Sequence, residues 1–170
     1  MLKKNKKGQV AVLDLFVSAL VFGILVATIM VTWNSYGVKI DKQLDYNTNL
    51  LRAYHISDLL TRFPGKPSFW GLQHALGPQD VEIIGLAKSD RILDTVKVIS
   101  FKNMDYNESK QKLGISSYEY YFRVSKLDGS DFSPAIESGI KDNESEITVT
   151  LKRYVIYNET ESILEFWLQK

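Results

Sequence analysis

The chain has 170 residues, with 21 lysines and arginines against 20 aspartates and glutamates, two histidines and no cysteine. Without cysteine the protein has neither disulfides nor thiolate metal ligands, and a near balance of charge lacks the basic face of a nucleic-acid-binding domain. Apolar residues make up 45% of the chain and aromatic residues 12%, enough to fill the core of one outward domain of ordinary size. We therefore expect a single domain held together by packing, with no nucleic-acid partner.

The first element is a long apolar segment near the N-terminus. Four lysines precede it: Lys3, Lys4, Lys6 and Lys7. The roughly 24 residues from Val10 to Trp33 would form a helix of about 36 Å, longer than the hydrocarbon core of a bilayer at about 30 Å. The segment is also longer than the apolar core of a secretory signal peptide, and no small-residue cleavage site follows it. We expect a retained membrane anchor.

Charge around this segment predicts its orientation. The four lysines lie before it, whereas the residues just after it carry Lys39 and Lys42 against Asp41 and Asp45. Basic residues favour the cytoplasmic side of a membrane. The N-terminus is therefore expected in the cytoplasm, and the C-terminal domain outside the cell.

The helical pattern continues after Trp33 and stops at Phe63-Pro64-Gly65, because proline restricts the residue before it. Apolar positions at helical spacing predict a buried stripe, made of Ile40, Leu44, Leu51, Tyr54, Leu59 and Leu60. The opposite face is expected to meet water, with Asp41, Lys42, Asp45, Asn49, Arg52 and Asp58. One helix from about Val10 to Arg62 is the favoured interpretation; the alternative is a hinge at Asn34 to Gly37.

The chain beyond Pro64 consists of short segments with turn residues. Phe63 to Gly71 is predicted to be an extended loop with Phe69 and Trp70 as apolar anchors. Three further segments follow: a possible short strand at Val81 to Leu86, a strand or helix at Ile92 to Phe101, and a polar helix at Asn103 to Leu113 that Gly114 ends.

The clearest strand signals lie near the C-terminus. Tyr118 to Ser125 alternate apolar and polar residues, and Asp128-Gly129 then marks a turn. Ile147 to Tyr157 and Ile163 to Leu168 flank a polar turn and predict an antiparallel hairpin. We expect an α+β fold in which an antiparallel sheet of three to five strands covers the amphipathic half of the long helix, with aromatic side chains filling the core rather than forming an adhesive surface.

The segment Lys6 to Phe16, KKGQVAVLDLF, resembles the class III signal peptide of archaeal type IV pilin-like proteins. In that family a membrane-embedded prepilin peptidase cuts after the glycine, which implies a processing site at Gly8 and Gln9. The family usually carries glutamate at the fifth mature position. Here that position is Leu13, and Asp14 is fifth only if the cut falls after Gln9.

The resemblance implies four regions: a basic leader at 1–8, a transmembrane and assembly helix at 9–33, an amphipathic continuation at 34–63, and an extracytoplasmic β-rich head at 64–170. It implies a structural subunit, a minor pilin or pseudopilin among the options, of a surface filament or type IV pilus-like complex. The implied partners are the bilayer, the prepilin peptidase and other pilin-like subunits in a homo- or hetero-oligomer. The alternative is a monomeric, single-pass anchored domain with a binding or sensory role.

Asp14 is the one acid inside the apolar segment. A carboxylate in hydrocarbon is costly and needs a partner, which the cationic mature N-terminus of a neighbouring subunit would supply. Asp14 is then an assembly residue that sets subunit register. The alternative is a hydrated carboxylate near the cytoplasmic interface.

No motif for catalysis or metal binding is found. His55 and His74 lack carboxylates at metal-site spacing, and there is no nucleophile elbow or phosphate-binding glycine loop. We expect no enzymatic activity, no metal and no cofactor. Three sequons, at Asn107, Asn143 and Asn158, are candidate N-glycosylation sites; the alternative is chance occurrence in a serine-rich chain.

Overall fold

The computed structural model describes residues 6–72, 81–141, 145 and 147–170, with side chains from Val12 onward. It divides into two compact units, Met1–Asp45 and Tyr46–Lys170.

Helix α1 (Lys6–Arg62) is continuous over 57 residues. It passes through Asn34 to Gly37 in helical conformation, so the predicted single helix is confirmed and the alternative hinge is not present. The helix ends at Arg62, two residues before Pro64, as expected from the restriction that proline places on its predecessor.

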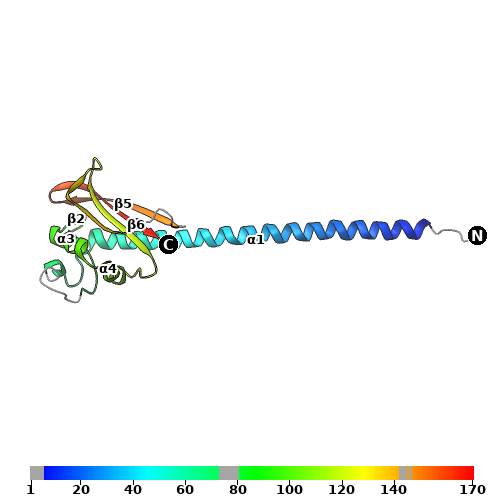
Figure 1. The fold of residues 1–170 in the computed structure, drawn as a ribbon, viewed down its shortest axis with the longest axis horizontal. Helices are drawn as coiled ribbons and strands as arrows, with labels where there is room; N and C mark the ends of the chain where they lie inside the picture. Colours follow the sequence, from blue (N-terminus) through cyan, green and yellow to red (C-terminus); the bar gives the residue numbers. More distant parts are fainter. Residues whose placement is uncertain (1–5, 73–80, 142–144, 146) are drawn as a thin grey trace, which may run out of the picture. The chain divides into compact units, whose positions relative to one another are not determined.

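The described part of the second unit contains a six-stranded sheet and two short helices, α3 and α4, after α1, and residues 70–72 are also helical (Figure 1). In chain order the elements are β1 (Ala87–Ser89), β2 (Ile92–Leu93), α3 (Thr95–Asn103), α4 (Tyr106–Lys112), β3 (Glu119–Lys126), β4 (Asp131–Gly139), β5 (Thr148–Tyr157) and β6 (Thr160–Gln169). The strand order is β1-β2-β5-β6-β3-β4. The predicted α+β class is confirmed.

The sheet differs from the prediction in two respects. It is mixed, because β2 pairs in parallel with β5 through Ile92 and Ile156, while the other pairs are antiparallel. It also has six strands instead of three to five, because it includes the short β1–β2 hairpin. These two strands are too short for an alternating pattern of apolar and polar residues to be recognised in the sequence.

The predicted C-terminal hairpin is confirmed. β5 and β6 pair in antiparallel register from Thr148↔Gln169 to Tyr157↔Thr160. Their turn has positive φ at Asn158 (48°) and Glu159 (62°), the combination that a two-residue hairpin turn of type I′ requires.

Two predicted segments differ from the observed elements, and one observed strand was not predicted. Within Val81 to Leu86 only Ile83 forms an isolated bridge, to Lys66. Ile92 to Phe101 is a two-residue strand followed by helix α3, which Asp94 caps by accepting from the N–H groups of Val96 and Lys97. Strand β4 was not predicted, because it contains Pro134, which is tolerated at a sheet edge but weakens the strand signal.

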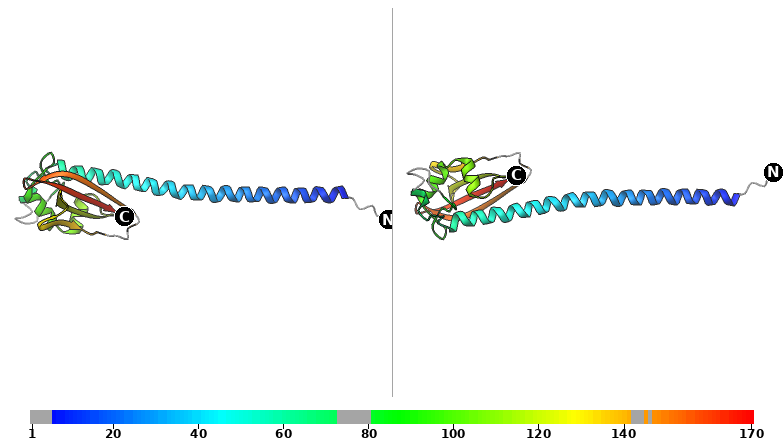
Figure 2. Two further views of the ribbon diagram at one scale, coloured as in Figure 1. Left: turned by 90° about the horizontal axis from the view of Figure 1, so that it is seen from above. Right: turned by 90° about the horizontal axis from the view of Figure 1, so that it is seen from below.

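The core of the second unit lies between the sheet and the three helices that cover one face (Figures 1 and 2). Phe101 of α3 meets Phe122 of β3 edge to face, with ring centroids 5.1 Å apart. Tyr106 of α4 stacks on Tyr120 at 5.1 Å. As expected, strand aromatics fill this core, which α1 enters through Ala53, Ile56 and Leu60.

The buried face of α1 matches the predicted stripe only in part, since Leu60 is fully buried as expected. Leu51 and Tyr54 are 71% and 50% exposed, whereas Asn49 and Ile56 are each 2% exposed. The small side chain of Ala53 is fully buried in the same core. The prediction was wrong at Leu51 and Tyr54 because it gave most weight to the largest apolar residues.

The segment after α1 is held by Trp70. This side chain is fully buried and donates from Nε1 to the carbonyl oxygen of Gly85 at 2.8 Å. Phe69, the other predicted anchor, is 54% exposed. A Cβ at Gly85 would collide with the carbonyl oxygen of Phe63, so glycine is required where these two segments cross.

Candidate functional site

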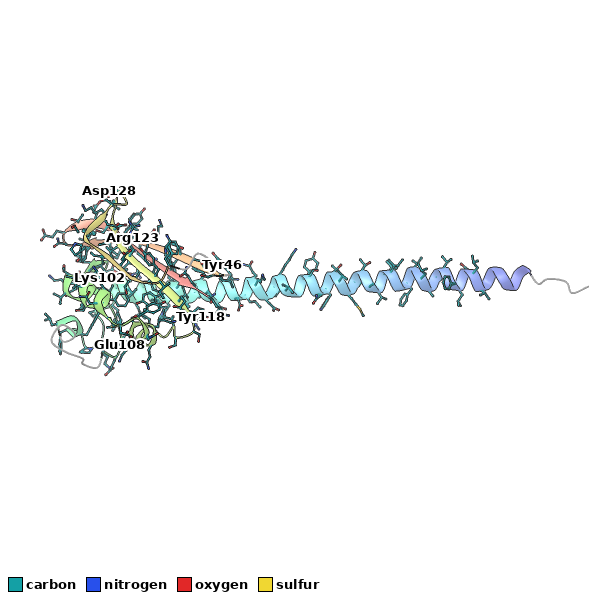
Figure 3. The ribbon with its side chains drawn as sticks, in the orientation of Figure 1. Tyr46, Lys102, Glu108, Tyr118, Arg123 and Asp128 are labelled. Atoms are coloured by element: carbon teal, nitrogen blue, oxygen red, sulfur yellow. The ribbon has the colours of Figure 1, made fainter. Side chains whose placement is uncertain are left out.

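The first unit presents an apolar helical surface from Val12 to Val38, which we call the apolar segment. Its large apolar side chains are exposed, with Leu15 at 73% and Trp33 at 80%, and Figure 3 shows side chains standing out around the helix before Tyr46. By length and composition α1 could cross a membrane, and none of its most apolar window is buried. The core helix of a soluble domain would be buried.

Hydroxyl groups in this segment bond to the helix itself. Thr28 donates to the carbonyl oxygen of Ile24 at 2.8 Å, Thr32 to that of Thr28 at 2.7 Å, and Ser35 to that of Val31 at 2.9 Å. These bonds satisfy the side-chain donors without water. Such back-bonding allows threonine and serine to lie in an apolar environment.

The residues implied by the resemblance lie at the start of α1. Gly8 and Gln9 are in its first turns, and Asp14 is an exposed residue of the same helix. Within the described part of the chain, no cation is paired with Asp14. Processing at Gly8 and Gln9 and a register role for Asp14 stay predictions.

The structure places the sequons in different environments. Asn158 is exposed in the β5–β6 turn, where Thr160 is exposed too. Asn107 is exposed on α4, but Ser109 of the same sequon is fully buried and bonds to the hydroxyl of Tyr120 at 2.6 Å. Asn143 lies outside the described residues. Of the two sequons described, the one at Asn158 is better presented to a modifying enzyme.

The two histidines do not form a site that the structure describes. His55 is exposed on α1, and His74 lies outside the described residues. No group of three or more potential metal ligands is found within residues 6–72, 81–141, 145 and 147–170.

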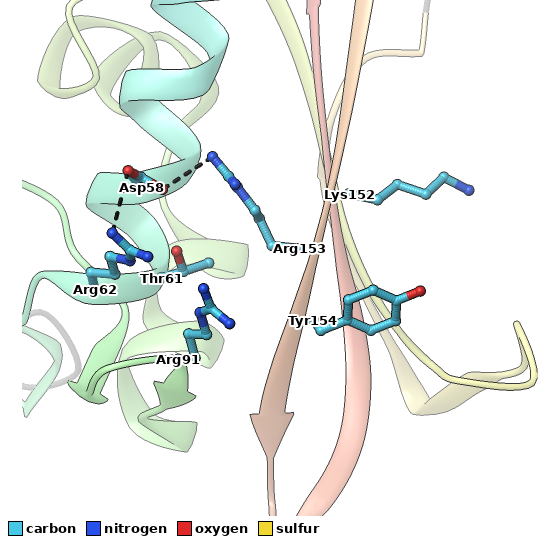
Figure 4. Close-up of a pocket in the computed structure, with 7 residues that line it drawn as sticks. All are labelled: Asp58, Thr61, Arg62, Arg91, Lys152, Arg153 and Tyr154. Atoms are coloured by element: carbon cyan, nitrogen blue, oxygen red, sulfur yellow. Dashed lines mark ion pairs between the residues drawn. The ribbon is translucent and has the colours of Figure 1, made fainter.

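A cavity rich in arginine lies between the end of α1 and strand β5 (Figure 4). It has a volume of about 130 Å³ and is lined by Asp58, Thr61, Arg62, Arg91, Lys152, Arg153 and Tyr154. We call it the arginine cavity. Sequence reasoning missed it because no local pattern connects residues of the helix, the β1–β2 turn and β5.

Ion pairs fix part of this cavity. Arg153 lies with Nη2 3.0 Å from Asp58 Oδ1, and its Nε donates to the Ser57 hydroxyl at 3.1 Å. Arg62 lies 3.8 Å from Asp58 and 3.3 Å from Asp90. Figure 4 shows Arg91 pointing toward Thr61 and Arg153, whereas Lys152 and Tyr154 point away on the other side of β5.

Comparisons with protein-family models, with curated proteins and with solved structures find no match for this chain. What the structure establishes is an α+β protein with a long N-terminal apolar helix followed by a small mixed sheet. This arrangement is consistent with a pilin-like fold.

Proposed function

We propose that this chain is a pilin-like structural subunit, a minor pilin or pseudopilin among the options, of a cell-surface filament or type IV pilus-like complex. The apolar segment is the assembly element, and residues 64–170 form the head outside the cell. The observation that carries the proposal is the apolar segment itself, whose large apolar side chains are exposed. Such a surface needs lipid or other helices around it.

Small residues support helix association. Ala19, Gly23 and Ala27 repeat at intervals of four in the apolar segment, and a Cβ at Gly23 would meet nothing within 4 Å in the single chain. Small residues at this spacing let apolar helices approach closely. The same segment would therefore span the bilayer first and pack against neighbouring subunits after processing.

Processing by a prepilin peptidase is the first testable part of this function. We expect N-terminal sequencing of the protein from native membranes to begin at Gln9 or Val10. An intact Met1 would contradict processing and favour the permanently anchored monomeric domain.

Assembly is the second part. Asp14→Ala should abolish filaments in electron micrographs of surface fractions, because the mature N-terminus of the neighbour loses its carboxylate partner. Asp41→Ala is a matched control, since it removes an exposed acid of the same helix after the apolar run. Unchanged filaments in Asp14→Ala cells would rule out the register role, and a processed subunit found only as a monomer would rule out the assembly function.

A further inference from the structure

The arginine cavity has more positive charges than acidic partners. Arg62, Arg91 and Arg153 face it with one acid, Asp58, and Asp90 pairs with Arg62 from outside. These five groups leave one positive charge without a counterion. Four of the 21 basic residues precede Gly8, so 17 remain against 20 acidic ones and the rest of the chain has a net charge of −3. The cavity is thus a local cationic site in an acidic protein.

Capping of α1 does not explain these arginines. The last carbonyl groups of the helix already accept from backbone N–H groups: Leu59 from Phe63 at 3.1 Å, Leu60 from Leu86 at 3.0 Å, and Thr61 from Arg91 at 2.9 Å. Arginine side chains often bond to such terminal carbonyls. Here the terminal carbonyl groups of α1 are already bonded, so the guanidinium groups of the cavity are not needed to cap the helix.

Arg91 is held in place by hydrogen bonds of its backbone, and among the described residues its side chain has no bonding partner. Its N–H donates to Thr61, and its carbonyl oxygen accepts from the N–H of Ile156 at 2.8 Å. The residue is held at φ 58°, a conformation uncommon for residues other than glycine. Among the described residues, no acceptor faces the Arg91 guanidinium, whose donors form a rigid fork suited to carboxylate and phosphate oxygens.

The side chain of Arg153, which also lines the arginine cavity, is held in one orientation by its neighbours. Its guanidinium lies 4.2 Å from the ring centroid of Tyr54 and is fixed through Nε by Ser57. Its Nη2 lies close to Asp58 but without the geometry of a hydrogen bond. Because Nη2 itself is buried, Arg153 offers the cavity its positive charge and the 24% of its side chain that is exposed.

We propose that the arginine cavity binds a small oxyanion group, a phosphate or a carboxylate, between the guanidinium groups of Arg91 and Arg153. The surplus of one positive charge fits a monoanionic group, and about 130 Å³ accommodates one such group. The group can be a free solute or part of an acidic sugar. This inference does not depend on the proposed assembly function.

The test is calorimetric titration of the full-length protein in detergent with inorganic phosphate and, separately, with glucuronate. We expect saturable binding of at least one probe, and tighter binding of glucuronate would identify the sugar acid as the source. Arg91→Asn should weaken binding at least about tenfold, because a charge-assisted hydrogen bond is lost. Asparagine tolerates positive φ, so the turn should keep its fold, which the melting temperature checks.

Lys88→Gln is the matched control. Lys88 is an exposed cation of the neighbouring strand β1 that does not line the arginine cavity, so its variant should keep wild-type affinity. Absence of saturable binding for both probes would overturn the proposal. Equal weakening in Lys88→Gln and Arg91→Asn would also overturn it, since it would indicate general charge attraction only.

Discussion

Lys97 of α3 donates from Nζ to the carbonyl oxygen of Pro64 at 2.7 Å, and so ties this helix to the segment that follows α1. A second bond, of 3.1 Å, runs to the carbonyl oxygen of Ala87. The residue is 5% exposed. Burial lowers the pKa of Lys97 below its usual value, and the two carbonyl groups replace the water that its ammonium group loses.

Lys97→Met should therefore destabilise the second unit. The methionine keeps much of the volume but removes both donors, and an unpaired buried acceptor costs about 1–3 kcal/mol. Thermal unfolding followed by circular dichroism measures the effect. Lys88→Met, at an exposed position of β1, should change stability by no more than about 0.5 kcal/mol, and equal effects of the two variants would contradict a structural role for Lys97.

The two sides of α1 should respond differently to truncation. Ile56→Ala removes a side chain that is 2% exposed and should cost about 2–5 kcal/mol of unfolding free energy. Leu51→Ala, at a position 71% exposed, should cost no more than about 0.5 kcal/mol. Chemical unfolding of both variants measures this difference.

Leu51 also separates folding from assembly. If exposed apolar residues of α1 pack against neighbouring subunits, Leu51→Glu should reduce filament formation while leaving the melting temperature of the second unit near that of the wild type. Normal filament yield from Leu51→Glu would show that this face of α1 is outside the subunit contact.

Tyr121 provides a pH-dependent prediction. Burial, reinforced by the hydrogen bond that its hydroxyl donates to Glu137 at 2.9 Å, raises the pKa of Tyr121 from 10.0 to about 12. The folded state keeps this proton between pH 10 and about 12 while the unfolded state loses it. The stabilisation is therefore complete below pH 10 and is lost as the pH rises toward about 12.

Carbon-13 NMR of labelled tyrosine rings measures this titration, with Tyr121→Phe assigning the signal. We expect a midpoint near pH 12 in the wild type and a lower one in Glu137→Gln, whose side chain lacks the carboxylate. A wild-type midpoint near the ordinary value of 10 would contradict both the burial of Tyr121 and its contact with Glu137 in solution.

The sequons should differ in occupancy. Glycosylation at Asn158 should be lost in Thr160→Ala, which removes the sequon but keeps the asparagine at its φ of 48°. Asn107→Gln should leave the intact mass of native protein unchanged apart from the substitution, since Ser109 of that sequon is buried. A glycan mass that disappears in Asn107→Gln but persists in Thr160→Ala would contradict this assignment.

Local patterns predicted much of this fold. The apolar N-terminal run and Pro64 predicted α1 and its end at Arg62. Alternating apolar and polar residues predicted β3 and the β5–β6 hairpin. The buried face of α1 was predicted only in part, because burial at Ala53 depends on which residues of the folded second unit pack around it. Strand β4 lacked alternation and contains Pro134.

The candidate sites were predictable to different degrees. The apolar segment is evident from composition, and Gly8, Gln9 and Asp14 follow from a resemblance that the structure does not test. The arginine cavity depends on tertiary packing, which brings Arg91 and Arg153 together from distant parts of the sequence. Only the folded chain places their side chains in one cavity.

Both lateral borders of the sheet discourage growth by strand addition. Among the described residues β5 is paired with β2 only near its end, at Ile156, and the stretch of β5 that β2 leaves unpaired contains Lys152 and Arg153. The opposite border, β4, contains Pro134, which has no N–H to donate. Charged residues and proline are common means of preventing edge-to-edge aggregation, so the head can be crowded at high local concentration without forming cross-β fibres.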